Sequence, residues 1–392
     1  MTASTVGARS PRLLQMIALV STLDRFAMPP MLIAMAHALG APLSAIVTAA
    51  GAYFLAYGLM QPLWGAASDR IGLVMTIRIS LTLAALSTII AAFSQTVVAL
   101  GVTRGLAGAC FSAAVPASLI YLGDTVPADR RQAEVTRLMT GLALGTAIAS
   151  SGAGALAQFA SWRLMFVLTG LGALVIVAFL GRLPQPPTVR AHASVLTPLL
   201  AVARSGPTRM VLGLAFVEGA VLLGVLTLLP AAVEASGAST SVAGVVTAVY
   251  GLAVLAFARV VGALSYRLHA SRLIALGAAS AVVACAITAV SRTPGVAVTA
   301  AVLLGLAWAS MHSSLQTWAT EVLPAARATV VSAFAAALFL GSALAAVFTG
   351  GLAEAHHYAQ IFGWATALAI PLGLFATVGR TRWTRPEGEP GR

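Results

Sequence analysis

The fold of this chain is decided by apolar runs such as residues 162–181, which read WRLMFVLTGLGALVIVAFLG. A helix of about 20 apolar residues crosses the hydrocarbon core of a bilayer. Similar runs lie on both sides, and together they predict spans at residues 13–36, 44–66, 73–93, 97–121, 136–158, 162–181, 210–233, 241–264, 273–291, 295–319, 328–352 and 358–379. Since backbone polar groups in lipid need partners within the chain, we expect an all-α membrane protein with twelve transmembrane helices.

The composition excludes the common soluble classes of protein. Of the 392 residues, 59% are hydrophobic and 9% are charged, whereas a soluble domain carries roughly 25% charged residues. A soluble enzyme, a disordered chain and a disulfide-stapled secreted domain are therefore excluded. Cys110 and Cys285 lie within apolar runs and lack metal-ligand spacing. The sequence has no Walker loop, zinc motif or nucleophile elbow, so we expect no catalytic residue, no metal site and no cofactor.

The positive charges orient the chain in the membrane. The net charge is +12, and all 23 basic residues are arginines. Eighteen of them fall in the terminal segments and alternate loops, whereas the opposite face holds Arg163 and Arg292. By the positive-inside rule both termini lie in the cytoplasm, which also accounts for the basic charge without nucleic acid. The first apolar run is too long for a cleaved signal peptide. We expect a multi-pass protein of the plasma (inner) membrane.

An internal repeat relates the two halves of the sequence. Residues 65–70 (GAASDR) close the second expected span, and residues 262–267 (GALSYR) close the eighth, 197 positions later. The same offset relates Tyr53 to Tyr250. Because six spans separate the copies, the two halves have the same orientation, which is one repeat plan of secondary transporters.

The longest loop divides the chain between these halves. Residues 183–208 contain five prolines and form the expected cytoplasmic linker, with a surface-lying helix around residues 195–202. Residues 1–182 then form an N-terminal six-helix bundle. Residues 209–392 form a C-terminal six-helix bundle with a short cytoplasmic tail.

The sequence after the second span resembles a signature of the major facilitator superfamily. Gly65-x-x-x-Asp69-Arg70-x-Gly72 is similar to the first-loop motif G-x-x-x-D-R-x-G-R-R/K of that family. Residues 73–74 are apolar where the family usually has basic side chains. The resemblance implies two six-helix bundles around a central cavity. It also implies a gating role for these four residues; the alternative is a solvated turn.

Other segments strengthen the resemblance. Residues 104–108 (RGLAG) are similar to the family's fourth-helix arginine motif, and residues 162–166 (WRLMF) resemble the start of its sixth helix. Residues 24–29 (DRFAMP) resemble proton-coupled twelve-helix drug exporters, in which a membrane-embedded carboxylate precedes a proline. The fifth span is rich in glycine but lacks the Gly-Pro of such exporters.

Two acidic residues lie deep within spans. A charge at mid-membrane costs about 2.5–3.5 kcal/mol on insertion scales, so each needs a reason. Desolvation favours the protonated form of Asp24, which suits proton coupling or substrate contact. The alternative is a structural charge partner for an arginine, although its neighbour Arg25 points in another direction along the helix. Glu218 maps onto residue 21, one turn from Asp24, and is expected to face the same cavity; an interhelical hydrogen bond is the alternative.

Further ionisable and aromatic residues are candidates for the central cavity. Arg104 could tune a carboxylate or contact an anionic substrate, or form a structural ion pair. His312 is a candidate proton site, or a packing histidine. At α-helical spacing it shares a face with Trp308 and Gln316, which we expect to line the cavity. The other expected lining residues are Arg25, which could instead pair across helices, and Phe26, Tyr53 and Tyr57, for which plain helix packing is the alternative.

The preferred interpretation is a secondary active transporter and not an enzyme. It predicts proton-driven efflux of a small lipophilic or amphipathic compound by alternating access. Its partners are a small-molecule substrate, protons and the lipid bilayer, and we expect a monomer. A proton symporter or facilitator that imports a small metabolite on the same fold is the alternative. A non-transporting membrane sensor or a membrane enzyme is less favoured.

Overall fold

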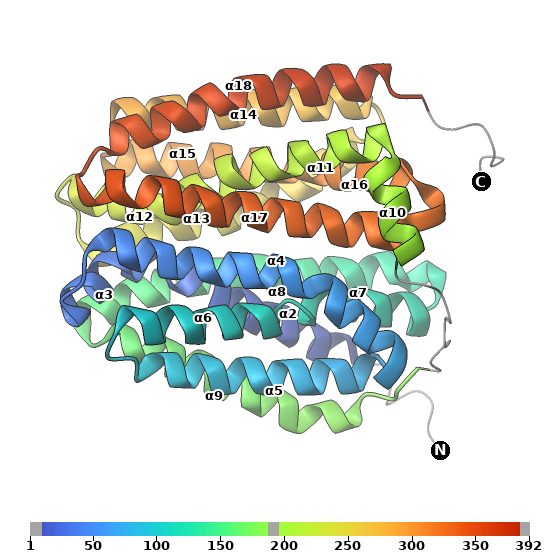
Figure 1. Cartoon of the computed structure of the whole chain (residues 1–392), viewed down its shortest axis with the longest axis horizontal. Coiled ribbons are helices and arrows are strands. Elements are labelled where there is room, and N and C mark those ends of the chain that lie inside the picture. Colours follow the sequence, from blue (N-terminus) through green and yellow to red (C-terminus); the bar gives the residue numbers. More distant parts are fainter. Residues whose placement is uncertain (1–9, 187–195, 385–392) are drawn as a thin grey trace.

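The computed structural model describes residues 10–186 and 196–384. Every regular element in this part of the chain is a helix (Figure 1). In chain order the elements are α2 (Ser10–Ala27), η1 (Pro29–Met31), α3 (Leu32–Leu39), α4 (Leu43–Ile71), α5 (Leu73–Ala92), α6 (Val97–Phe111), α7 (Ala114–Thr125), α8 (Ala128–Phe159), α9 (Trp162–Phe179), η2 (Leu180–Arg182), α10 (Leu196–Arg204), α11 (Gly206–Glu218), η3 (Gly219–Leu223), α12 (Gly224–Ala235), α13 (Thr240–Leu264), α14 (Ala270–Val290), α15 (Pro294–Ala307), η4 (Trp308–His312), α16 (Ser313–Glu321), η5 (Pro324–Ala326), α17 (Arg327–Glu354) and α18 (Tyr358–Arg382).

Twelve helical stretches of the described residues are long and apolar enough to cross a membrane, as predicted. Several extend beyond the expected apolar run. The second span continues to Ile71 and the fifth begins at Asp129, because a helix persists into water, where charged side chains are solvated. The expected surface helix is α10. The expected N-terminal leader, residues 187–195 of the linker and the last residues of the tail lie outside the described residues.

Four of the spans are interrupted near their middle; the fourth span is interrupted between α6 and α7, at residues 112–113. The first contains the pair Pro29-Pro30, where a 3-10 turn joins α2 to α3, because proline has no N–H for the helical ladder. The seventh and tenth contain π-helical turns, η3 and η4. Wide π turns inside α-helices occur frequently at functional sites. The interruptions of the first, seventh and tenth spans lie beside Arg25, Glu218 and His312.

The helices of the two halves form two adjoining layers in Figure 1. Helices α2 to α9 lie in the lower part of that view, and α11 to α18 lie in the upper part. The layers meet where α4 packs along α17 and where α8 packs along α13. The start of α2 and the end of α18 lie at one end of the molecule, here called the terminal end; the opposite end is the distal end.

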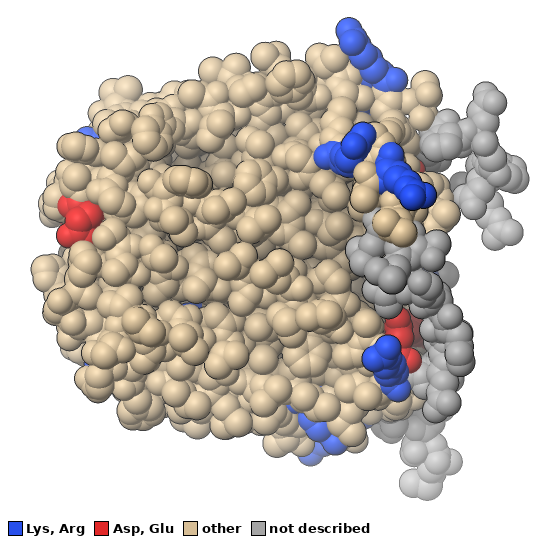
Figure 2. Space-filling model, viewed as in Figure 1, with Lys and Arg blue, Asp and Glu red and all other residues tan. Residues whose placement is uncertain are grey.

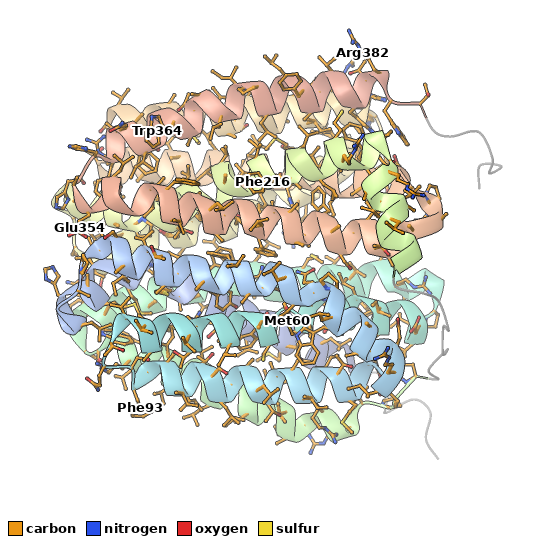
Figure 3. All side chains as sticks on the ribbon, in the orientation of Figure 1. Met60, Phe93, Phe216, Glu354, Trp364 and Arg382 are labelled. Carbon is orange, nitrogen blue, oxygen red and sulfur yellow. The ribbon has the colours of Figure 1, made fainter. Side chains whose placement is uncertain are left out.

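The surface of the molecule is mostly uncharged, as the low content of charged residues predicts. Figure 2 shows a broad uncharged band between the two ends, with arginines gathered at the terminal end. Large apolar side chains such as Phe93 and Trp364 are exposed on the outside. Figure 3 shows Glu354 at the distal end and Arg382 at the terminal end. This distribution suits lipid around the middle and water at both ends.

Glycines set the closest helix crossing. A side chain on Gly219 would come within 1.8 Å of the Leu338 carbonyl oxygen, and one on Gly341 within 1.9 Å of that of Phe216. The start of η3 therefore lies directly against α17. Small residues allow such close approach between transmembrane helices, and this contact fixes the position of Glu218, which immediately precedes η3.

Candidate functional site

Asp24 is held by a buried network from three helices. Arg104 Nη1 of α6 lies 2.9 Å from Asp24 Oδ1 of α2. Arg104 Nη2 donates to the Asp24 backbone carbonyl at 2.9 Å, and Thr88 Oγ1 of α5 donates to Oδ1 at 2.8 Å. Asp24 and Arg104 are each 0% exposed. The carboxylate is thus paired across helices with Arg104, and the neighbouring Arg25 takes no part.

Arg25 faces the opposite half of the molecule. Its Nη2 donates to the Tyr57 hydroxyl. Its guanidinium carbon lies 4.3 Å from the centre of the Tyr57 ring and 5.3 Å from that of Phe339, which belongs to α17. Nε of Arg25 is buried and has no hydrogen-bond partner among the described residues. No carboxylate of those residues forms an ion pair with it, so the charge of Arg25 lacks an acidic partner.

A small cavity is bordered both by Arg25 and by Arg104 of the buried ion pair. Its volume is about 10 Å³, which is room for about one water molecule. Nε of Arg104 is buried without a partner among the described residues. The lining thus combines two guanidinium groups with aromatic and apolar surface: Arg25, Met28, Pro29, Ala50, Tyr53, Phe54 and Arg104.

The second half contributes another buried pair. Glu218 Oε2, at the end of α11, lies 3.3 Å from His312 Nδ1 in η4. Glu218 is 0% exposed and His312 is 8% exposed. Oε1 of Glu218 has no hydrogen-bond partner among the described residues. The imidazole stacks on the Trp308 ring, with centroids 3.9 Å apart. Both π turns border the pair, η3 following Glu218 and η4 ending at His312.

Tyr250 connects these groups across the interface. It lies on α13 of the second half, within electrostatic reach of both Glu218 and Arg25. Its ring centre is 6.4 Å from that of Phe26 on α2. Its repeat counterpart Tyr53 lies within reach of Asp24, Arg25 and Arg104. Each half therefore places one tyrosine of the repeat beside its ionisable residues.

The remaining candidates lie in different surroundings. Asp69 and Arg70 are exposed at the end of α4 and form no ion pair with another described residue. Gly72 ends that helix with φ +88°, a backbone conformation that favours glycine, and Gly65 has open space around it. Gln316 is exposed, unlike His312, because the wider π turn changes the angular register after Trp308.

Two side chains cap helices across the interface at the distal end. Glu354 Oε2 of α17 accepts a hydrogen bond from the Ser44 backbone N–H at the start of α4, at 3.0 Å. Gln158 Oε1 of α8 accepts one from the Ser241 backbone N–H at the start of α13, at 2.8 Å. Ser44 and Ser241 are separated by the repeat offset of 197 residues. Each half therefore contributes one side chain that caps a helix of the other half at the distal end.

Toward the terminal end, the same four helices make different contacts between the halves than they make at the distal end. Gly58 approaches Ala336, and Gly251 approaches Ala143, near the middle of the interface. Closer to the terminal end, α4 and α13 present exposed residues around Gly65 and Gly262, and neither glycine has an atom of the other half near its Cβ position. The halves are joined from the distal end to the middle of the interface.

Some members of the site carry no mark in the sequence. Thr88 and Phe339 are residue types common in transmembrane helices, so no sequence pattern singles them out. Tyr250 is marked by the repeat offset. The pairings Asp24–Arg104 and Glu218–His312 join residues 80 and 94 positions apart, and only the packing of the helices shows them.

Comparison with known proteins agrees with this architecture. Among solved structures, the chain is similar to a bacterial homologue of the human lysosomal transporter Spinster in an inward-facing and unoccupied conformation, with 17% identity and a TM-score of 0.77 over 97% of this chain and 99% of that one. It is similar to the nucleoside transporter NupG, with 15% identity and a TM-score of 0.77 over 96% of this chain and 100% of that one. A third similar structure is a partially occluded inward open conformation of the xylose transporter XylE from E. coli, with 16% identity and a TM-score of 0.73 over 97% of this chain and 98% of that one.

Sequence comparison gives the family itself. No curated protein matches the chain. The family model of the Major Facilitator Superfamily matches residues 15–346 and, in a second match, residues 211–391. These matches cover most of the chain and include both halves of the repeat. The chain belongs to the Major Facilitator Superfamily and has the fold of its twelve-helix membrane transporters.

Proposed function

We propose that the chain is a proton-coupled secondary transporter that moves a small amphipathic compound by alternating access. The observation that carries this proposal is the pair of buried ionisable sites, Asp24–Arg104 and Glu218–His312, one from each half of the molecule. Charged groups within a membrane protein are costly and mark substrate, ion or proton pathways. Because the site lies between two halves of one chain, a monomer is sufficient for transport.

Glu218 and His312 are the better candidates for carrying the proton. A proton on Asp24 would leave Arg104 as a buried charge without a counter-charge, which is strongly unfavourable. The partner of Glu218 is an imidazole, a side chain that can take up or release a proton. That pair gains or loses one proton without breaking a direct ion pair with an arginine. Asp24, the first candidate from the sequence, is the alternative carrier.

The two closures fit an alternating-access cycle. The distal caps from Glu354 and Gln158 hold one end shut, while toward the terminal end no described atom of the other half lies near the Cβ positions of Gly65 and Gly262. With the terminal end in the cytoplasm of a plasma-membrane protein, this arrangement corresponds to an inward-facing state. We propose that the bundles of residues 1–182 and 209–392 rock about the site, and that Gly65, Asp69, Arg70 and Gly72 act in closure of the terminal end.

The proton and the substrate can be coupled in two ways, by exchange in opposite directions or by symport in the same direction. Resemblance to drug exporters favours exchange, in which a proton entering the cell drives efflux of a lipophilic or amphipathic compound. Symport, in which proton and substrate move together, is favoured by the charge of Arg25, which has no acidic partner among the described residues. One of the similar solved structures is described as a D-xylose-proton symporter. Measuring whether intact cells take up or extrude the substrate distinguishes symport from exchange.

Reconstitution of the full chain into liposomes tests the proposal. A panel of amphipathic acids, amines and neutral compounds is screened for flux under an imposed pH gradient, with an internal pH-sensitive dye. We expect at least one compound to move protons with it. Glu218→Gln should lose the pH-driven accumulation but keep substrate exchange, whereas the matched variant Glu134→Gln, in an exposed pair with Arg137, should keep both.

Three results would contradict the proposal in different ways. Loss of coupling in Asp24→Asn but not in Glu218→Gln would make Asp24 the proton carrier. Substrate flux that no pH gradient alters would leave a facilitator. Absence of flux for the whole panel, with folded protein in the liposomes, would favour the sensor or enzyme alternative.

A further inference from the structure

The charges around the interface do not balance within the first half. Arg104 is neutralised by Asp24 at 2.9 Å. Arg25 has the Tyr57 hydroxyl as its polar partner and no carboxylate within ion-pair distance among the described residues. Buried charges in proteins are paired with opposite charges or bind ligands. Arg25, which is partly buried, is therefore a cation without an acidic partner among the described residues of its own half.

The donors that remain free point to the kind of counter-ion. Nε of Arg25 and Nε of Arg104 are both buried and both without a partner among the described residues. Both guanidinium groups border the same small cavity. A guanidinium is planar, stays charged and matches the geometry of carboxylate and phosphate groups. A single water molecule can fill the cavity in this state, but it leaves the positive charge in place.

The walls next to Arg25 are aromatic. Its guanidinium lies against the Tyr57 and Phe339 rings. The Phe54 and Phe339 rings stack across the interface with centroids 6.1 Å apart. An anion bound here would place its remaining atoms between α4 of one half and α17 of the other. An apolar or aromatic body is the chemistry that these rings accommodate.

We propose that the substrate is an amphipathic organic anion whose acidic group pairs with Arg25 and whose apolar body packs between α4 and α17. This inference rests on the proposed transport function and names its substrate class. A carboxylate is the simplest acidic group that fits the free guanidinium donors. Because α4 and α17 belong to opposite halves, a ligand between them contacts both moving parts.

The charge count also sets the sense of coupling. With His312 neutral, two carboxylates, Asp24 and Glu218, balance two arginines, Arg25 and Arg104. One proton on the Glu218–His312 pair makes this cluster positive by one charge, and an anion restores neutrality. The proton and the anion therefore favour each other's binding and travel together, as in symport. A cationic substrate would compete with the proton instead.

No other aspartate, glutamate or arginine of the described residues is as buried as Asp24, Arg104 and Glu218. Tyr250 is the ionisable group of the opposing helix that lies within reach of Glu218 and of Arg25. The other ionisable residues on elements packed against the pair, most of them near helix ends, are Arg204, Arg209, Glu234, Arg259, Arg272, Cys285, Glu321, Arg327, Glu354, Tyr358, Arg380 and Arg382.

The test uses three probes of one shape and different charge on the purified full chain. They are 2-naphthoate, neutral 2-naphthamide and cationic 2-naphthylmethylamine, titrated at pH 6 and pH 8. Thermal unfolding reports binding, and proteoliposome uptake reports transport. We expect 2-naphthoate to bind, more tightly at pH 6. Arg25→Gln should weaken its binding about tenfold to 100-fold, the range for hydrogen bonds to charged groups. Arg25→Lys should recover part of the loss.

Controls separate the substrate class from folding and from the transport function. Arg137→Gln, which removes an exposed arginine, should leave binding unchanged. Tyr57→Phe removes the hydroxyl that holds Arg25 and keeps both the charge and the ring, so it should weaken binding less than Arg25→Gln does. Tighter binding of the amine, or 2-naphthoate binding that Arg25→Gln leaves unchanged, would overturn the anion proposal. Proton-coupled flux of the amine would do so while leaving the proposed transport function intact; absence of any coupled flux would contradict the transport function itself.

Discussion

Replacement of Asp24 by asparagine removes one charge from the most completely buried ion pair in the described structure. The variant keeps the shape of the side chain and an oxygen that can still accept from Thr88 and Arg104. The substitution therefore removes only the negative charge of Asp24. Two unit charges 2.9 Å apart attract by about 6 kcal/mol at an effective dielectric constant of about 20. Breaking one side of a buried pair costs about 3–5 kcal/mol, so we expect Asp24→Asn to lower the free energy of unfolding by about that amount.

A double-mutant cycle isolates this effect. Arg104→Gln alone leaves Asp24 unpaired and should cost a similar amount, whereas Asp24→Asn with Arg104→Gln removes both charges together. We expect the double variant to be more stable than the sum of the single losses by about 2–3 kcal/mol. The free energies are measured by denaturant unfolding of purified protein in detergent, followed by tryptophan fluorescence. Additive losses, or a single variant within about 1 kcal/mol of the parent, would refute the assignment of a structural ion pair.

Three further predictions concern closure and packing. Gln158→Ala removes one distal cap and should weaken the closed distal end by about 0.5–2 kcal/mol, seen as longer spin-label distances across that end; unchanged distances would show that the cap does not hold it. Gly341→Val should abolish folding because its Cβ would lie 1.9 Å from a carbonyl oxygen, whereas Gly213→Val, with open space around it, should be recovered as folded protein in normal yield. Gly72→Ala should destabilise the protein by about 1 kcal/mol or more at its φ of +88°, whereas Gly65→Ala, within a helix, should stabilise it by about 0.5–1 kcal/mol in thermal or denaturant unfolding; equal effects of the two would contradict the assignment of backbone strain.

The sequence by itself determined the coarse architecture. Apolar run length predicts twelve helices because lipid requires every backbone hydrogen bond to close within the chain. The offset of 197 residues predicts two related halves, and it also places Tyr53 and Tyr250 in corresponding positions. The high cost of burying charge marks Asp24, Arg104 and Glu218 as candidates, since few ionisable residues lie within the spans.

Tertiary structure decided which of these residues meet. A sequence does not show how each helix is rotated or where it crosses its neighbours. Helical spacing argued against Arg25 as the partner of Asp24 but could not show that Arg104 is the partner. Each π turn inserts one residue into the helical register, and helix propensity gives no sign of it. That insertion accompanies the contact between Glu218 and His312. The free charge of Arg25 emerges only when every carboxylate near it has been located.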